Sequence, residues 1–282
     1  MAARRRLLAA AGLLLALSGC ALARAGAPVR VALLAPFEGR YREVGYNALY
    51  AARLALQDAG APTVELLPVD DGGSADSAAS RARALALDPH TRVVIALGCA
   101  AASADTLAAF GDLPVLVAGH WGAQPTKPEV FVLAAAGLDR ALTAPPCISV
   151  TAAARLPAPL VGGETLALAQ FPLLRADLTG VVVASSAALP AADFAARYRA
   201  SDAFAPPPGL LATLTYDAAR LAAQVAAAAP DRAAALRALL NASYDGLTGT
   251  LRFSGGWWQG APIRRFRYDD QRALMPVDGV IE

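Results

Sequence analysis

The side chains with the most distinctive chemistry in this sequence are its three cysteines, two histidines and one pair of adjacent carboxylates. Cys20 ends the tetrapeptide Leu17-Ser18-Gly19-Cys20, which follows directly on an apolar run. A thiol in this setting is typical of the bacterial lipoprotein signal, in which the sulfur takes a lipid before the peptide is cleaved. The sequence therefore predicts acylation of Cys20. The alternative is an ordinary secretory signal with a cysteine nearby.

The residues before Cys20 have the composition of such a signal. Arg4–Arg6 form the positively charged n-region of a signal peptide. Leu7–Leu17 is an apolar run too short to cross a bilayer, which needs about 20 residues. We expect residues 1–20 to be removed as a signal peptide and residues 21–28 to form a tether. The protein would then be extracytoplasmic, in the periplasm or at the cell surface, and anchored to the lipid bilayer through Cys20.

The other two cysteines are Cys99 and Cys147. An extracytoplasmic compartment permits disulfides. The sequence does not place the two Cα atoms within bridging distance, so a disulfide and two free buried thiols both stay open.

No constellation of residues indicates catalysis or metal binding. His90 and His120 are too few for a typical zinc site without clustered cysteines. Gly-x-Ser-x-Gly, phosphate-loop and His-Glu-x-x-His motifs do not occur, and the Asp70-Asp71 pair precedes two glycines, as in a turn. The basic residues form no stripe of the kind that binds nucleic acid. We expect a protein that is not an enzyme, needs no cofactor, and binds no metal and no nucleic acid.

Residues 29–117 alternate between apolar runs and helical spacing, with about 56% hydrophobic residues in the whole chain. This alternation predicts a parallel sheet covered by helices on both faces, with ligands bound at the carboxyl ends of the strands. The expected strands are 29–34, 64–69, 93–97 and 114–117, and the expected helices are 44–59, 74–87 and 103–110.

The pattern loosens after residue 120, and residues 144–159 are rich in proline with no clear period. Further strands are expected at 130–135, 159–163, 180–186, 250–253 and 263–268, and further helices at 193–200, 214–229 and 231–240.

Three stretches of the sequence resemble one family, the leucine/isoleucine/valine-binding proteins. These are lipid-anchored, type I periplasmic substrate-binding proteins of bacterial ABC transporters. The first stretch is Val31–Gly39 with Val44-Gly45 and Ala51–Leu56, and the second is Val93–Gly98 with Pro114–Val117. The third combines Asp193–Arg199, Thr215–Leu221 and Gly246–Phe253, and its order and register are the most specific.

The resemblance implies an α/β fold of the periplasmic-binding-protein-like I class, with two Rossmann-like lobes whose parallel sheets are joined by a hinge. Lobe 1 would comprise residues 29–120 plus 209–257, and lobe 2 residues 121–208 plus 258–282. The hinge crossings would lie near Gly119, Pro208–Gly209 and Gly255-Gly256. Family members are typically longer, and the missing part falls between Val132 and Leu160, so we expect a reduced second lobe.

The resemblance also implies where a ligand would bind. Ser103 would offer a hydroxyl to a carboxylate, although it could equally cap a helix. Gly119, His120 and Trp121 occupy a second ligand loop, where Trp121 either walls the pocket or packs at the hinge. Glu164 matches the acidic partner of a ligand ammonium, or is a solvated loop charge. Tyr41 is a weaker candidate for the pocket wall.

These features favour a lipid-anchored solute receptor that delivers a small polar solute to an ABC permease in the membrane. The solute class implied by the family is an amino acid, branched-chain or related. The alternative is a binding-fold lipoprotein that does not transport and acts as a ligand sensor or a protein-interaction module at the cell envelope. The shortened second lobe favours that alternative.

Overall fold

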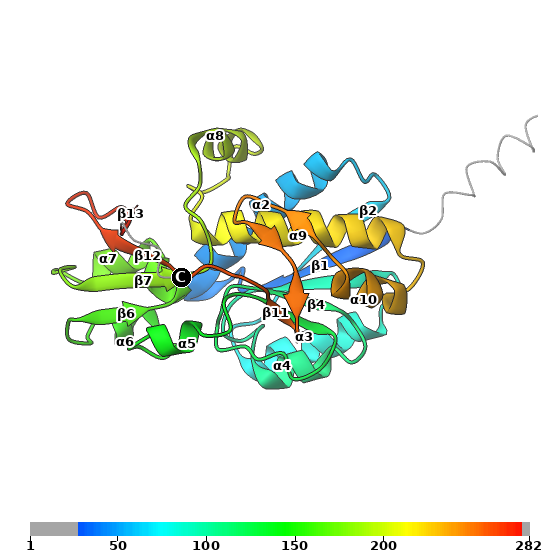
Figure 1. Cartoon of the computed structure of the whole chain (residues 1–282), viewed down its shortest axis with the longest axis horizontal. Coiled ribbons are helices and arrows are strands. Elements are labelled where there is room, and N and C mark those ends of the chain that lie inside the picture. Colours follow the sequence, from blue (N-terminus) through cyan, green and yellow to red (C-terminus); the bar gives the residue numbers. More distant parts are fainter. Residues whose placement is uncertain (1–27, 278–282) are drawn as a thin grey trace, which may run out of the picture.

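The computed structural model describes residues 28–277, which form two lobes built on two separate sheets (Figure 1). Cys20 and the expected signal peptide lie outside the described residues. The first sheet has seven strands in the order β10-β11-β5-β4-β3-β1-β2, and the second has four in the order β13-β12-β7-β6. The second sheet and its helices lie at the left of Figure 1, beside the larger first lobe.

Lobe 1 follows the strand and helix alternation predicted from the sequence. Its first five strands run in parallel. They are β1 (Val29–Ala35), β2 (Val64–Asp70), β3 (Thr91–Ala96), β4 (Val115–Ala118) and β5 (Val130–Leu133). β1, β3, β4 and β5 are mostly buried, whereas β2 is the partly exposed edge strand. Helices α2 (Arg42–Ala59) and α9 (Leu210–Ala228) cover one face, and α3 (Ala75–Leu87) and α4 (Ala104–Ala109) the other (Figure 1).

Local signals fix the ends of these helices. Ser74 and Asp231 accept hydrogen bonds at the first turns of α3 and α10 (Arg232–Leu240). Gly60 ends α2 in the left-handed conformation, with φ +60°, as expected of a glycine cap. The helix expected at 214–229 begins four residues earlier, because Gly209 holds its start by donating to Asn47 Oδ1 on α2 at 2.9 Å.

Lobe 2 is the smaller one, as predicted. Only β6 (Leu160–Gly162) and β7 (Val181–Ser185) are parallel; β12 (Arg264–Tyr268) and β13 (Leu274–Pro276) complete the sheet in antiparallel pairing. Its helices are short. They are α5 (Leu138–Ala141), α6 (Val150–Ala153), η2 (Glu164–Ala167) and α7 (Gln170–Leu174).

The remaining elements are short and lie in lobe 1 or near the lobe junction. They are η1 (Gly39–Tyr41), α8 (Ala192–Ala200), β8 (Tyr244–Asp245), β9 (Thr250–Leu251), β10 (Phe253–Ser254) and β11 (Trp257–Trp258).

Two segments lie in a different lobe from the one expected. β5 belongs to the first sheet, where its four buried apolar residues pair with β4. α8 packs on α2, with the rings of Tyr198 and Tyr50 6.5 Å apart and the Tyr198 hydroxyl donating to the Asn47 carbonyl. Residues 121–133 and 192–208 are therefore not part of lobe 2. The crossings fall after β5, after β7, and between β11 and β12. The first two lie away from Gly119 and Pro208–Gly209, whereas the third lies close after Gly255-Gly256.

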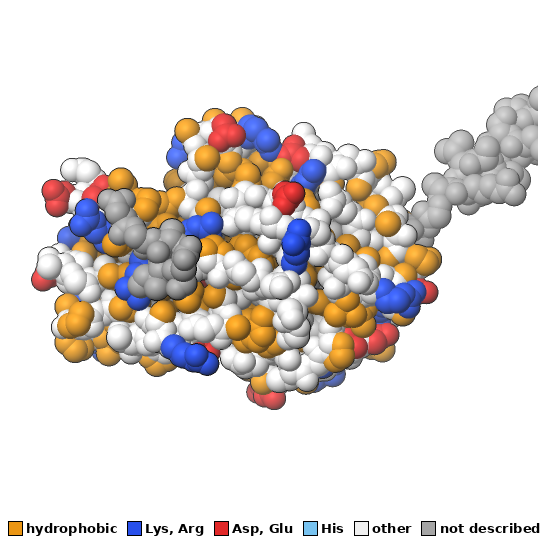
Figure 2. Space-filling view, in the orientation of Figure 1, with side chains coloured by type: hydrophobic (Ala, Val, Ile, Leu, Met, Phe, Trp, Pro, Cys, Tyr) orange, Lys and Arg blue, Asp and Glu red, His pale blue; other side chains and the backbone are white. Residues whose placement is uncertain are grey.

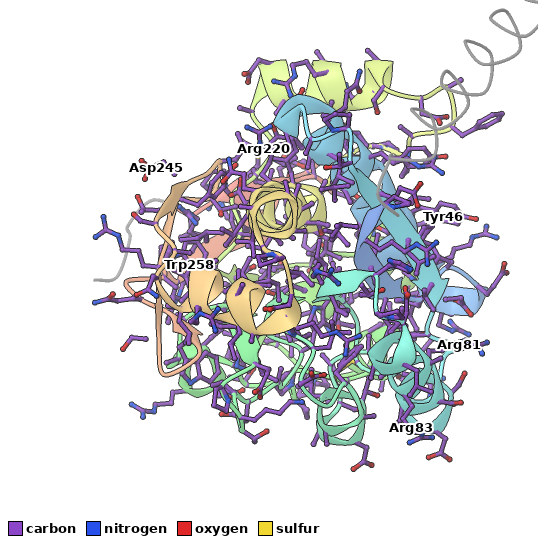
Figure 3. All side chains as sticks on the ribbon, turned by 90° about the vertical axis from the view of Figure 1, so that its right-hand side faces the viewer. Tyr46, Arg81, Arg83, Arg220, Asp245 and Trp258 are labelled. Carbon is purple, nitrogen blue, oxygen red and sulfur yellow. A yellow bond between two sulfur atoms is a disulfide. The ribbon has the colours of Figure 1, made fainter. Side chains whose placement is uncertain are left out.

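Charged side chains are interspersed on the face drawn in Figure 2, with basic and acidic groups near one another. Viewed from the side, α9 passes end-on through the middle of lobe 1, between the labelled Trp258 on one flank and Tyr46 on the other (Figure 3). Fifteen of the α9 residues are buried, so this helix forms the centre of the lobe 1 core.

Candidate functional site

A cavity of about 150 Å³ lies between the two lobes. Lobe 1 contributes Tyr41, Asp71, Gly98–Ala100 and Trp121, and lobe 2 contributes Cys147–Ser149 and Thr165. Cavities of this volume hold molecules about the size of benzene. The site is therefore suited to a small solute.

The lobe 1 residues of the cavity follow the carboxyl ends of four parallel strands. Tyr41 comes after β1, Asp71 after β2, Gly98–Ala100 after β3 and Trp121 after β4. Parallel α/β sheets bind ligands at this edge, because the loops that leave the strands converge there.

Three hydrogen bonds hold the second lobe against this edge. The Tyr41 hydroxyl accepts from the Val150 N–H at 3.3 Å, and Glu43 Oε1 accepts from the Ala169 N–H at 2.7 Å. Gln170 Nε2 donates to the Arg40 carbonyl at 3.0 Å. Burial in this contact raises the pKa of Glu43. The lobes are thus closed over the cavity.

Trp121 lines the cavity in an unusual backbone conformation, with φ +46°. Its Nε1 donates to the Ala118 carbonyl at 2.8 Å, which folds the indole back over Gly119. A Cβ at Gly119 would lie 2.7 Å from Trp121 Nε1, and the glycine itself has φ +101°. Only glycine fits this position without a rearrangement.

His120 lies behind the cavity wall. It is fully buried, its Nδ1 accepts from the Gly122 N–H at 3.2 Å, and its ring stacks on Trp257 with centroids 6.2 Å apart. Its Nε2 lies 3.4 Å from Asp139 Oδ1 on α5. His120 therefore packs at the junction of the lobes and is not among the residues that line the cavity.

Glu164 is buried rather than solvated, with 2% of its surface exposed. Its Oε1 accepts from the Ser185 hydroxyl at 3.0 Å, and its carboxyl carbon would lie 3.4 Å from a Cβ at Gly119. Within residues 28–277, no lysine or arginine forms an ion pair with it. The carboxylate thus lies beside the Gly119–Trp121 loop, next to the cavity residue Thr165, with a hydroxyl but no cation for a partner.

Ser103 serves as the cap of α4. Its hydroxyl accepts from the Thr106 N–H at 3.3 Å and donates to Thr106 Oγ1 at 2.9 Å. The structure does not bring it to the cavity, which is lined instead by Gly98–Ala100 from the same loop. Of the six predicted ligand contacts, Tyr41 and Trp121 line the cavity. Gly119 and Glu164 lie next to Trp121 without being among the lining residues, and Ser103 and His120 are elsewhere.

Asp71 is a cavity residue that the sequence analysis assigned only to a turn. It is buried, and its Oδ1 accepts from the Gly73 N–H at 2.8 Å, so the turn exists as well. Burial raises the pKa of this carboxyl. Its place directly after a parallel strand was the signal that could have identified it.

Cys99 and Cys147 form a disulfide, with their Cα atoms 5.6 Å apart. The sequence left this pairing open. Both residues line the cavity, one from each lobe, so the bond crosses the cleft.

Within residues 28–277 no three His, Cys, Asp or Glu side chains gather into a group that could hold a metal ion. None of the helices in that span is long and apolar enough to cross a membrane.

Two α/β lobes that close over a small cavity define a two-lobed binding protein. Residues 28–144 match the family model described as periplasmic binding protein. The described residues have the type I periplasmic-binding fold, which is the fold that the resemblance to the leucine/isoleucine/valine-binding group implies. No curated protein matches the chain by sequence.

Solved structures of three bacterial binding proteins illustrate the likeness. The branched-chain amino acid transporter substrate-binding protein LivJ from Streptococcus pneumoniae, in complex with isoleucine, has a TM-score of 0.68 at 14% identity, over 89% of this chain and 100% of that one. The leucine-binding protein LivK from Thermotoga maritima has a TM-score of 0.68 at 12% identity, over 90% and 99%. A solute-binding protein from R. palustris in complex with benzoate has a TM-score of 0.65 at 15% identity, over 90% and 96%.

Proposed function

We propose that this chain is the solute receptor of an ABC transporter, anchored outside the cytoplasmic membrane by a lipid on Cys20. It binds a small solute that carries an ammonium group, an amino acid of the branched-chain type or a relative, and passes it to a membrane permease. Binding stabilises the closed arrangement of the two lobes.

The buried carboxylate of Glu164 carries this proposal. A buried charge without a partner is costly, and an ammonium group placed against it would supply both the opposite charge and hydrogen-bond donors. The Trp121 indole lines the cavity from the Gly119–Trp121 loop beside this carboxylate, and the faces of aromatic rings attract cations.

The neighbouring structures support a solute of this size but not one particular molecule. Those from Streptococcus pneumoniae and Thermotoga maritima are described with isoleucine and as leucine-binding, whereas the one from R. palustris holds benzoate. Apolar atoms dominate the cavity wall of this chain, which favours a solute with an apolar side chain.

A thermal-shift screen of residues 21–282 tests the proposal, with the common amino acids, short amides and urea-like compounds as probes. A ligand at about 100 times its Kd stabilises the folded state by about 2.7 kcal/mol. For a chain of this size that raises the melting midpoint by about 5 to 10 °C.

Glu164→Gln is the decisive variant, because it keeps the side-chain volume and removes the charge. Loss of one partner of a buried charged pair costs about 2 kcal/mol or more, so the affinity falls at least about 30-fold. Glu65→Gln, an exposed position on β2, is the matched control and leaves the shift unchanged. The screen is run with and without excess dithiothreitol, because a disulfide crosses the cleft and could prevent solute entry. A reduced, folded protein that responds to no probe contradicts the receptor proposal and supports the alternative, a non-transporting sensor or interaction module.

A further inference from the structure

The disulfide joins two parts of the protein that must separate when the cleft opens. Cys99 follows β3 of the first sheet. Cys147 lies between α5 and α6, in a segment fixed to β6 by hydrogen bonds from the N–H groups of Thr143 and Ala144 to the Val161 carbonyl, at 2.8 and 3.0 Å. The bond is therefore a covalent link between the lobes, additional to the three chain crossings.

The position of the bond limits the opening of the cleft directly. Its Cα atoms are 5.6 Å apart, and a disulfide cannot span Cα atoms more than about 7 Å apart. Two-lobed binding proteins exchange ligand by hinge rotation, which separates the opposing walls of the cavity. With the bond intact, the walls at Cys99 and Cys147 can move apart by little more than an ångström.

The same bond is open to attack from solvent. Both cysteines are exposed residues, unlike the buried strands β3 and β4 beside them. Disulfides are broken by a thiolate that attacks one of the sulfurs, and exposed bonds are the labile ones. The Cys99–Cys147 bond therefore restrains the lobes and can also be reached by a reductant.

We propose that Cys99–Cys147 is a redox modification site that latches the lobes closed, and that its reaction partner is a dithiol reductant. In the exchange the dithiol gives two electrons and two protons to the cysteines. The S–S bond of the protein breaks to leave two thiols, and an S–S bond forms in the reductant. Reduction frees the hinge for solute entry and release. The reverse exchange closes the cleft again: the two cysteine thiols give two electrons and two protons to a disulfide oxidant, whose S–S bond breaks as the Cys99–Cys147 bond forms.

The contacts that remain after reduction are ones that water can replace. Tyr41, Glu43 and Gln170 provide single hydrogen bonds across the cleft. The lobes of the reduced protein therefore exchange between closed and open arrangements, whereas those of the oxidised protein do not. This inference concerns the opening motion itself and holds whatever the solute is.

The test is a distance measurement between the lobes of residues 21–282. Keto amino acids are introduced at Leu87 on α3 and Leu173 on α7, which are 84% and 79% exposed. They carry spin labels attached without thiol chemistry, and pulsed dipolar spectroscopy gives the distance distribution. We expect one narrow population in the oxidised protein and an additional, longer one after excess dithiothreitol, which disappears on reoxidation.

The double variant Cys99→Ser/Cys147→Ser is measured in parallel, with and without dithiothreitol. We expect the longer population in both conditions, with a cooperative thermal transition retained. Identical distributions in the oxidised, reduced and double-variant proteins would overturn the proposal. Loss of the cooperative transition in both the reduced protein and the double variant would also overturn the proposal. The disulfide would then be required for folding rather than for control of lobe opening.

Discussion

The Nε2 atom of His120 lies 3.4 Å from Oδ1 of Asp139, across the junction where the chain leaves the first lobe for the second. His120 follows β4, and Asp139 is on α5. The two partners differ in environment, since the His120 side chain is fully buried whereas that of Asp139 is 47% exposed. The contact thus combines a packed ring, stacked on Trp257, with a carboxylate that water can reach.

Packing rather than charge should dominate this contact. We expect His120→Ala to lower the free energy of unfolding by about 2 to 4 kcal/mol, because it leaves a hole against Trp257. Asp139→Ala should cost less than about 1 kcal/mol, as for other solvent-screened pairs. Urea denaturation of the two variants gives both values. Equal losses would contradict this assignment and make the polar contact between His120 and Asp139 the main interaction.

Gly119→Ala tests the close approach of the backbone to Trp121 and Glu164. The added Cβ would meet Trp121 Nε1 at 2.7 Å, and the backbone has φ +101°. Gly60→Ala is the matched control, because Gly60 has φ +60° but open space around its Cβ position. The control should lose about 1 to 2 kcal/mol from backbone strain alone.

Gly119→Ala should lose about 1 to 3 kcal/mol more than Gly60→Ala, because the Trp121 indole must move. Thermal and urea unfolding of both variants measure the difference. If the two variants are equally destabilised, the Trp121 indole moves away from the added Cβ at no cost in stability. The loop at Gly119 would then be more mobile than its contacts indicate.

Asp217 on α9 is a buried carboxylate that organises the loop before β9. Its oxygens accept from the Leu247 and Thr248 N–H groups at 2.8 and 2.7 Å, and from the Thr248 hydroxyl. Burial raises the pKa of Asp217 despite these hydrogen bonds, which lower it. Protons therefore bind more tightly to Asp217 in the folded protein than in the unfolded one.

The sign of the pH dependence follows from that shift. The contribution of Asp217 to stability is fully present below about pH 3.9, its unfolded pKa, and is lost as the pH rises through the higher folded pKa. We expect Asp217→Asn to destabilise the protein by about 1 to 3 kcal/mol, because the amide cannot accept all of these hydrogen bonds.

The difference in unfolding free energy between wild type and Asp217→Asn should be largest at acid pH and narrow as the pH rises. Urea denaturation at several pH values measures this difference. The contributions of the other carboxylates are the same in both proteins and cancel. A difference that widens with increasing pH would show that the folded protein lowers the pKa of Asp217 instead.

The first lobe could be predicted from the sequence because its signals are local. β1, β3 and β4 each contain an unbroken buried apolar run (Val31–Ala35, Val93–Ala96 and Val115–Ala118), as expected of strands buried on both faces. Gly60 marks the end of α2. In the second lobe the sequence predicted the strands β6, β7 and β12 but not the helices α5 and α6. These helices are single turns of four residues whose positions depend on tertiary contacts.

The same division holds for the candidate site. Tyr41, Trp121 and Glu164 were identified from their places after strands and from the family likeness. The sequence left two roles open for Ser103, and the local contact with Thr106 makes it the cap of its own helix. The sequence could not show that residues 144–159, which lack any period, would bring Cys147 to Cys99. That contact depends on how the two lobes meet, which no single segment encodes.

Tyr41→Phe tests the closed contact between the lobes in the reduced protein. The change removes the hydroxyl that accepts from the Val150 N–H at 3.3 Å and leaves the ring in place. A hydrogen bond of this kind contributes about 0.5 to 1.5 kcal/mol, so the ratio of open to closed lobes should rise roughly 2- to 10-fold. The spin-label pair at Leu87 and Leu173 measures that ratio.

Tyr46→Phe is the control for the loss of a tyrosine hydroxyl. Tyr46 is on α2, is 38% exposed and packs edge-on against Phe37, and it lies on the flank of lobe 1 labelled in Figure 3. The Tyr46→Phe substitution should leave the fraction of molecules with open lobes unchanged. In the oxidised protein Tyr41→Phe should also have no effect, because the disulfide holds the cavity walls together without the hydrogen bond. An oxidised Tyr41→Phe protein that opens would show that the lobes part elsewhere in the cleft while the disulfide stays intact.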